Sequence, residues 1–251
     1  MSELRGIRTL WTREIKKFLR EKPRLINAFC QPLIWLFLFG TGMRFSATVS
    51  GYNYQEFIFP GLVCQAMLFT AMFMGISVIW DREFGFLKEI LVSPLSRSSI
   101  FLGKMLGVST DVMFQGIIVF PFAFLIGAHM DLIIFFEALP VMILITIGLV
   151  SIGLVLASVL KSFEGFGLFQ TFINLPMFFL SGALFPLSNV PAWLQGICYA
   201  NPLTYGVDAL RTVIMGGTWT PLFPLYVDMG VLLVFDVIMF SLGTYTFGRT
   251  D

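Results

Sequence analysis

Long uncharged stretches dominate this chain, and each is close to the length that crosses a lipid bilayer. A helix rises about 1.5 Å per residue, so about 20 apolar residues cross a hydrocarbon core of about 30 Å. The pattern therefore predicts an all-α integral membrane protein. Five candidate spans are Leu25–Met43, Phe57–Trp80, Val112–Ala128 with a backward extension through Met105–Thr110, Ala138–Leu160 and Phe223–Phe247.

The longest uncharged stretch, Gly165–Val207, is too long for one crossing. As a single helix its 43 residues would measure roughly 65 Å, about twice the membrane. Prolines along it break the helix, because proline removes a donor and clashes with the preceding turn. Gly165–Leu184 suffices for a span, which makes six transmembrane helices. Residues 186–207 are predicted to form a short re-entrant or interfacial helical hairpin between spans five and six, with a seventh span as the alternative.

Residues 1–24 carry the pattern of an amphipathic helix, with apolar positions three and four apart and cations on the opposite face. Such a helix lies in the membrane interface, where its cations contact lipid phosphates. It is either a plain anchor or a lever that couples a cytoplasmic partner to the first span; residues 25–251 form the transmembrane domain. The apolar positions are Leu4, Ile7, Leu10, Trp11, Ile15, Phe18 and Leu19, and the cations are Arg5, Arg13, Lys16, Lys17 and Arg20.

The largest polar segment inside the chain is Asp81–Lys104, between spans two and three. Apolar spacing predicts a helix over Asp81–Val92, which Ser93-Pro94 stops because a residue before proline leaves the α region. Ser96 or Ser98 then caps the next span. Two dozen residues are too few for a catalytic domain, but a short helix could dock into another protein; a solvated loop is the alternative. Its charged docking candidates are Arg82, Glu83, Lys88 and Glu89.

The distribution of cations predicts the orientation. With six spans, 14 of the 16 Lys and Arg residues lie on one side, and only Arg44 and Arg211 lie on the other. By the positive-inside rule, the protein is a multi-pass protein of the cell (cytoplasmic) membrane with both termini in the cytoplasm. Charged residues make up 12% of the chain, against roughly 25% in soluble domains, and the net charge of +1 gives no sign of nucleic-acid binding.

Three acidic residues, Asp111, Asp228 and Asp236, fall within or beside apolar spans. A charge near the middle of a bilayer costs roughly 2.5–3.5 kcal/mol on insertion scales, so such residues are functional candidates. The alternative is a protonated or hydrogen-bonded packing role against neighbouring helices. No Lys or Arg inside the membrane is evident as a partner.

Motifs for catalysis are absent from the sequence. It contains no G-x-x-x-x-G-K-[ST] phosphate loop, no H-E-x-x-H, no C-x-x-C and no G-x-S-x-G. The single histidine, His129, has no partner at metal-ligand spacing. The chain is expected to be a non-catalytic subunit that binds no cofactor or metal of its own.

Three motifs in order resemble one known family. They are Phe178–Leu187 (FFLSGALFPL) followed by Val190-Pro191 and Trp193-Leu194, Asn201–Arg211 (NPLTYGVDALR), and Arg82–Pro94 (REFGFLKEILVSP). The last is similar to R-E-x-G-x-x-x-E-x-L-x-x-x-P, with the proline one position earlier. Together with the topology they resemble the membrane subunit of ABC-2 type exporters, the group of daunorubicin-resistance permeases and of nodulation and polysaccharide exporters. The family's signature maps onto Asn201, Pro202, Tyr205, Asp208 and Arg211.

The resemblance implies a dimer of two such permeases, identical or related, each bound by a separate ATP-binding subunit that holds ATP and Mg. It also implies six spans, an amphipathic amino-terminal helix, a re-entrant hairpin, and a coupling helix at about 81–92. A drug-like or lipid-like amphiphile is the first expectation for the substrate, and a polysaccharide or glycolipid is the second. A different class, an ion-coupled secondary transporter using Asp228 and Asp236, would need inverted repeats, which the sequence does not show convincingly.

Overall fold

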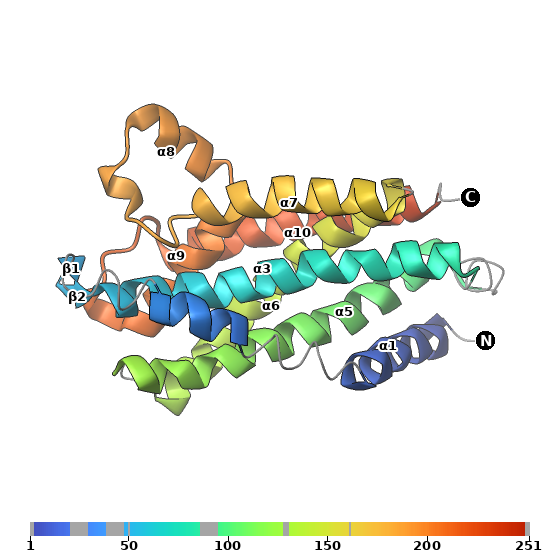
Figure 1. Ribbon diagram of the computed structural model, residues 1–251, viewed down its shortest axis with the longest axis horizontal. Helices are drawn as coiled ribbons and strands as arrows, with labels where there is room; N and C mark the ends of the chain where they lie inside the picture. Colours follow the sequence, from blue (N-terminus) through green and yellow to red (C-terminus); the bar gives the residue numbers. More distant parts are fainter. Residues whose placement is uncertain are drawn as a thin grey trace.

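Long helices run lengthwise side by side and form a bundle (Figure 1). The computed structural model describes residues 3–20, 30–38, 48–49, 51–85, 95–127, 131–160 and 162–248. Residues 30–38 are helical. The other elements are α1 (Glu3–Arg20), β1 (Thr48–Val49), β2 (Tyr52–Asn53), α3 (Tyr54–Glu83), α5 (Arg97–Val119), the 3-10 helix η1 (Phe120–Ile126), α6 (Leu132–Val159), α7 (Phe163–Phe179), η2 (Leu187–Asn189), α8 (Ala192–Tyr199), α9 (Pro202–Met215), η3 (Gly216–Thr218) and α10 (Leu225–Gly248).

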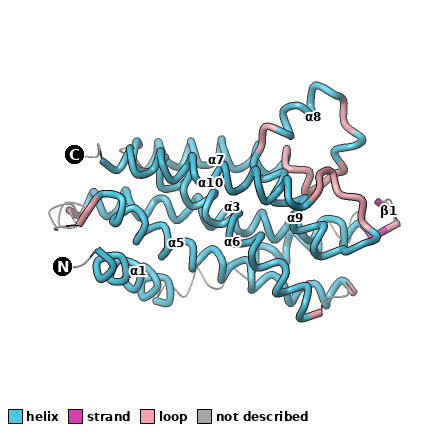
Figure 2. Tube along the Cα trace, turned by 180° about the vertical axis from the view of Figure 1, so that it is seen from behind, coloured by secondary structure: helices cyan, strands magenta, loops and turns pink. Residues whose placement is uncertain are grey.

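The two ends of the bundle differ in character. Helix α1 and the end of α10 lie at one end, and the small antiparallel pair β1–β2 lies at the other with α8 and α9 (Figures 1 and 2). Helix α8 projects away from the lengthwise helices in both views. Cations of α1 therefore gather at the end opposite the α8–α9 segment.

Four described helices are long and apolar enough to cross a membrane. They are Tyr54–Glu83, Arg97–Ile126, Leu132–Val159 and Leu225–Phe247, and they correspond to the predicted spans two, three, four and six, with earlier starts for spans two, three and four. The protein is thus all-helical apart from its two-residue strands and is built for a bilayer. The first predicted span, Leu25–Met43, lies mostly outside the described residues, of which 30–38 are helical.

The fifth predicted span ends earlier than its sequence suggested. Helix α7 stops at Phe179, whereas Gly165–Leu184 was expected to be continuous. Its 17 residues measure about 25 Å, less than the hydrocarbon core. The chain leaves the helix at Leu180 and turns through Gly182, which has φ 73°. A positive φ suits glycine, so the turn is fixed at this position.

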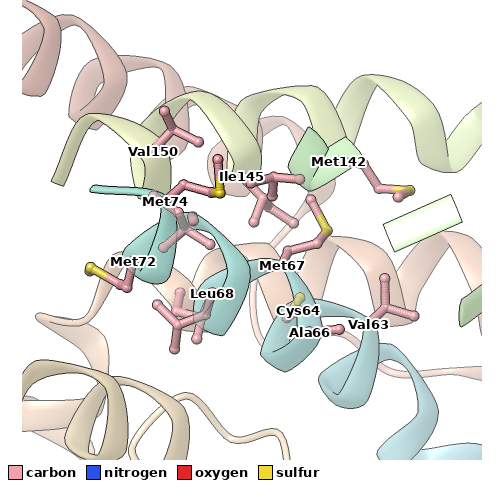
Figure 3. Packing of buried hydrophobic residues seen from close by; sticks show 14 of the residues in the cluster. Val63, Cys64, Ala66, Met67, Leu68, Met72, Met74, Met142, Ile145 and Val150 are labelled. Atoms are coloured by element: carbon pink, nitrogen blue, oxygen red, sulfur yellow. The ribbon is translucent and has the colours of Figure 1, made fainter. Parts of the chain in front are cut away.

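The interior of the bundle is packed with aliphatic side chains and methionines. Met67 from α3 and Met142 from α6 converge in the view of Figure 3. Both reach the backbone of Gly116 in α5, where an added Cβ would lie 2.4 Å from Met142 Cε. Flexible thioether side chains fill such irregular space well. The contact joins three of the candidate spans.

Helices α3 and α6 cross at a pair of glycines. A Cβ on Gly75 would lie 2.5 Å from the carbonyl oxygen of Gly153, and one on Gly153 would lie 2.8 Å from that of Ala71. The backbones therefore approach closely, as small residues allow at helix contacts in membranes. No larger residue fits this crossing without separating the helices.

We predict that Gly75→Ala lowers the thermal stability of the purified protein. Overpacking of a core costs about 1–3 kcal/mol, which corresponds to about 2–4 °C in Tm per kcal/mol for a chain of this size. Thermal unfolding in detergent measures the change. Gly230→Ala in α10 is the control, because nothing lies within 4 Å of its added Cβ, and it should be neutral or stabilising. Equal melting temperatures for the two variants would contradict the close crossing.

Candidate coupling site and outer hairpin

Helix α1 packs lengthwise on the first half of α5. Leu10 lies against Gly103, and Glu14 lies against Gly107, so that a Cβ on Gly107 would be 2.5 Å from the Glu14 Cβ. The residue numbers of the contacting pairs increase in the same direction along both helices, so the helices are parallel. The two glycines are four residues apart and share one helix face. They form the groove that receives α1.

Four charged side chains from three helices meet where α1 contacts the bundle. Lys104 of α5 donates to Asp81 Oδ2 at the end of α3, and its Nζ lies 3.9 Å from Glu14 Oε1. Arg13 Nη2 donates to Asp81 Oδ1 at 3.0 Å. Lys104, Asp81 and Glu14 are buried, while Arg13 is half-buried. Two carboxylates and two cations balance in this group, which we call the α1 ion cluster.

The α1 ion cluster changes the interpretation of Lys104. The sequence placed Lys104 at the end of the polar segment Asp81–Lys104, yet its side chain is 1% exposed. Helix α5 begins at Arg97, so Lys104 lies two turns inside it and faces α1 and α3. Sequence reasoning also missed Glu14; its spacing of four from Leu10 and from Phe18, on the apolar side of a cationic helix, was the available signal.

The predicted docking helix does not begin at Asp81. Asp81, Arg82 and Glu83 are the last residues of α3, and the chain turns at Gly85, which has φ 79°. Helix α3 continues through Asp81 and Arg82, because both side chains find partners on neighbouring helices. Arg82 donates to the carbonyls of Leu160 and Ser158 at the end of α6, both at 2.9 Å.

Among the docking candidates, Glu83 is exposed, while Arg82 is partly buried against α6. Lys88 and Glu89 lie outside the described residues, as does most of the predicted helix at 81–92. In the described part of this segment, the exposed carboxylate of Glu83 thus lies at the end of α3, next to the contact of Arg82 with α6. The docking role of all four residues stays a prediction.

A polar contact fixes the far side of the same segment. Ser96 caps α5 by accepting from the Ser99 backbone N–H at 3.2 Å, as the sequence predicted. The Ser96 backbone N–H donates to Glu3 Oε1 of α1 at 3.2 Å. Hydrogen bonding from Ser99 and from the Ser96 backbone lowers the pKa of Glu3 below its ordinary value. Helix α1 is therefore attached to both sides of the chain that includes residues 86–94.

The opposite end of the bundle is held by hydrogen bonds from α9. Asn201 caps α9 by accepting from the Leu203 N–H, and its amide donates to the Met177 carbonyl of α7 at 2.7 Å. Thr204 donates to the carbonyls of Cys198 and Leu180. These carbonyls belong to helix ends, which lack partners within their own helices. The predicted hairpin at 186–207 thus consists of η2, α8 and the start of α9, although α9 continues to Met215.

Arg211 is a buried cation at the centre of this end. Its Nε donates to the Phe57 carbonyl at 3.3 Å and its Nη2 to the Gly182 carbonyl at 3.0 Å. The guanidinium carbon lies 4.0 Å from the centre of the Phe57 ring and 5.4 Å from that of Trp219. Burial lowers the pKa of Arg211 to about 10, opposed by Asp208, so it remains a cation at neutral pH. It ties α3, α9 and the turn after α7 together.

The other signature residues shape the same region. Pro202 is the first residue of α9, where its missing N–H costs nothing. Tyr205 donates to the Tyr199 carbonyl at 2.8 Å. Asp208 Oδ2 accepts from the backbone N–H groups of Leu222 and Phe223, which lead into α10. All five signature residues thus lie at the cap or within α9, and four of them make side-chain hydrogen bonds. We call this region the outer hairpin, after the side on which the sequence predicts it.

The three intramembrane acids are buried on separate sites. Asp111 lies in α5, and Asp228 and Asp236 lie in α10. Asp236 faces α6, because a Cβ on Gly148 would lie 2.6 Å from its Oδ1. Asp228 and Asp236 have no hydrogen-bond partner among the described residues. In that part of the chain no three His, Cys, Asp or Glu side chains gather as metal ligands.

Comparison with known proteins assigns this architecture to a family. The family model described as ABC-2 type transporter matches residues 5–215, from α1 to the end of α9. The chain belongs to the ABC-2 type transporter family. The matched range contains both the α1 ion cluster and the outer hairpin, so these two ends lie within the family's shared region.

Relatives of this ABC-2 permease carry transport names. It is 32% identical to the putative transport permease ycf38 of Cyanophora paradoxa, over 89% of this chain and 83% of the relative. Nodulation protein J of Rhizobium leguminosarum bv. viciae is 27% identical, over 88% and 85%. The inner membrane transport permease YadH of Escherichia coli (strain K12) is 26% identical, over 94% and 91%. The chain is a membrane transport permease.

We predict that Lys104→Met destabilises the permease by up to about 3–5 kcal/mol, because the buried carboxylates of Asp81 and Glu14 then keep only the half-buried Arg13 as a cation. The Tm in detergent measures the loss. Arg97→Met removes an exposed cation from the same helix and should change stability by no more than about 0.5 kcal/mol.

A second substitution tests the cause of that loss. Lys104→Met combined with Asp81→Asn removes one of the two buried charges and should recover part of the stability. If Lys104→Met were no less stable than Arg97→Met, the buried ion cluster would be wrong.

Proposed function

We propose that this permease is the membrane-spanning subunit of an ATP-binding cassette exporter, driven by a separate ATPase subunit that binds ATP and Mg. Two permease subunits, identical or related, form the translocation pathway across the cell membrane. Each has six transmembrane helices with both termini in the cytoplasm, and the outer hairpin is re-entrant from the opposite side. The substrate is a hydrophobic or amphiphilic molecule of the drug or lipid type.

The observation that carries this proposal is the anchoring of the described residues on either side of residues 86–94. The chain enters this segment from α3, where Asp81 binds α1 and α5 and Arg82 binds the end of α6. It leaves the segment at Ser96, where α5 begins and Glu3 is bound. Force applied by a partner to this segment therefore reaches four helices directly. A solvated loop would need no such anchoring.

The re-entrant assignment is supported by side-chain hydrogen bonds to backbone carbonyls in the turns. A non-helical backbone at membrane depth is tolerated only where protein satisfies its polar groups. Side chains of α9 donate to the Leu180 and Gly182 carbonyls in the turn after α7. The Tyr54 hydroxyl donates to the Leu184 carbonyl at 3.0 Å. Exposed Trp193 on α8 suits the interface, where aromatic rings collect.

We predict that the double change Glu83→Ala and Glu89→Ala weakens coupling without preventing membrane insertion. Loss of charged contacts at a docking surface should reduce transport per ATP hydrolysed by about fivefold or more. Co-purification with the ATPase subunit and transport in proteoliposomes provide the two measurements.

The control is Asp131→Ala with Glu137→Ala, which removes two exposed acids at the other end of the bundle. It should leave coupling unchanged. Unaltered ATP-driven transport in the Glu83/Glu89 variant would reject the docking assignment. Transport by the permease alone, driven by an ion gradient and abolished by Asp228→Asn, would instead support the secondary-transporter alternative.

A further inference from the structure

The face of α1 that is turned away from α5 is a cationic groove. It has a volume of about 780 Å³. Arg13 takes part in the α1 ion cluster, but no described carboxylate pairs with Arg8, Lys16, Lys17 or Arg20. The plain amphipathic pattern does not explain a hollow of this size. Its lining residues are Arg8, Thr9, Thr12, Arg13, Lys16, Lys17 and Arg20.

The opposite side of α1 packs on α5. Trp11 Nε1 donates to Thr110 Oγ1 at 2.9 Å, and the rings of Phe18 and Phe114 meet edge to face at 5.6 Å. Thr110 and Phe114 belong to the candidate span Arg97–Ile126. The second half of α1 therefore lies beside the part of α5 that enters the membrane, where lipid headgroups meet the hydrocarbon.

Three apolar side chains of α1 lie beside the groove and are exposed in the described structure. Leu4, Trp11 and Leu19 are 79%, 40% and 60% exposed. At 100° per residue they lie on one stripe beside the contact with α5. Apolar residues of this kind enter the acyl boundary, while neighbouring cations remain at the headgroups. A water-filled docking surface for a protein would leave this stripe in water.

We propose that the groove of α1 binds the phosphate headgroup of an anionic phospholipid from the leaflet at this end of the bundle. Lys16 and Arg20, four residues apart on the same face, are its principal ligands, because the hydroxyls of Thr9 and Thr12 already donate to the carbonyls of Arg5 and Arg8. Because α1 is joined to α3 and α5 by the α1 ion cluster, the bound lipid positions the coupling site. The assignment to the cytoplasmic leaflet rests on the orientation in the proposed function.

The test compares retained lipids. The permease is purified from detergent micelles that contain equimolar phosphatidylglycerol and phosphatidylcholine, and mass spectrometry measures the ratio of the two lipids that remain bound. We expect the wild type to retain phosphatidylglycerol preferentially. Lys16→Gln with Arg20→Gln should lower the ratio by about 5- to 25-fold, because each cation near an anionic lipid contributes about fivefold.

The matched control is Arg5→Gln with Arg97→Gln, two exposed cations that do not line the groove. It should retain the wild-type ratio. A salt titration on the wild type needs no variant: about 1 M salt shortens the Debye length to about 3 Å and should weaken the preference.

Three results would overturn the proposal. The Lys16/Arg20 variant could keep the wild-type lipid ratio, or the control could lose as much, which would indicate unspecific attraction. In membranes of phosphatidylcholine alone, loss of ATPase binding by the Lys16/Arg20 variant would assign the groove to an acidic protein surface. Failure of the proposed function is distinguishable, since a wild type without ATP-driven transport could still retain phosphatidylglycerol selectively.

Discussion

The packing of α1 against α3 and α5 depends on the burial of Lys104 between two carboxylates. A buried ammonium is tolerated only when it is paired, and its partners Asp81 and Glu14 come from different helices. Separating α1, α3 or α5 would therefore expose an unpaired charge to an apolar interior. Gly103 and Gly107 complete the constraint, because they let α1 approach closely enough for Glu14 to reach the lysine. These helices are expected to move together.

The other end of the bundle solves a different problem with similar means. Here the chain turns several times among buried side chains, and its carbonyl groups need donors. Arg211, Asn201 and Thr204 supply them from one helix, α9. The predicted signature residues therefore largely supply donors for the carbonyl groups of these turns. Asp208 has the complementary role, since it accepts the N–H groups that lead into α10.

The sequence predicted the parts of the fold that depend on local properties. Long apolar helices were confirmed at the predicted spans two, three, four and six, because hydrophobic length alone selects them, and Ser96 was confirmed as a cap. The start of the docking helix was wrong because Asp81 and Arg82 find partners on helices distant in sequence, so α3 continues through them. Lys104 was missed for the same reason, since its neighbours are known only once α1 and α3 are placed beside α5. The short α7 was missed because its end depends on a turn at Gly182, which a hydrophobicity pattern does not reveal.

The pairing of α1 with α5 has a consequence for how the chain is made. Leu10 and Gly103, which touch in the finished protein, are separated by 93 residues. At about 5–20 residues per second, the ribosome needs about 5–20 s to add that length. During this interval Glu14 lacks the ammonium group of Lys104. In the proposed orientation the cations and the exposed tryptophan of α1 would hold this helix at the lipid surface, within reach of α5, until the buried charges are matched.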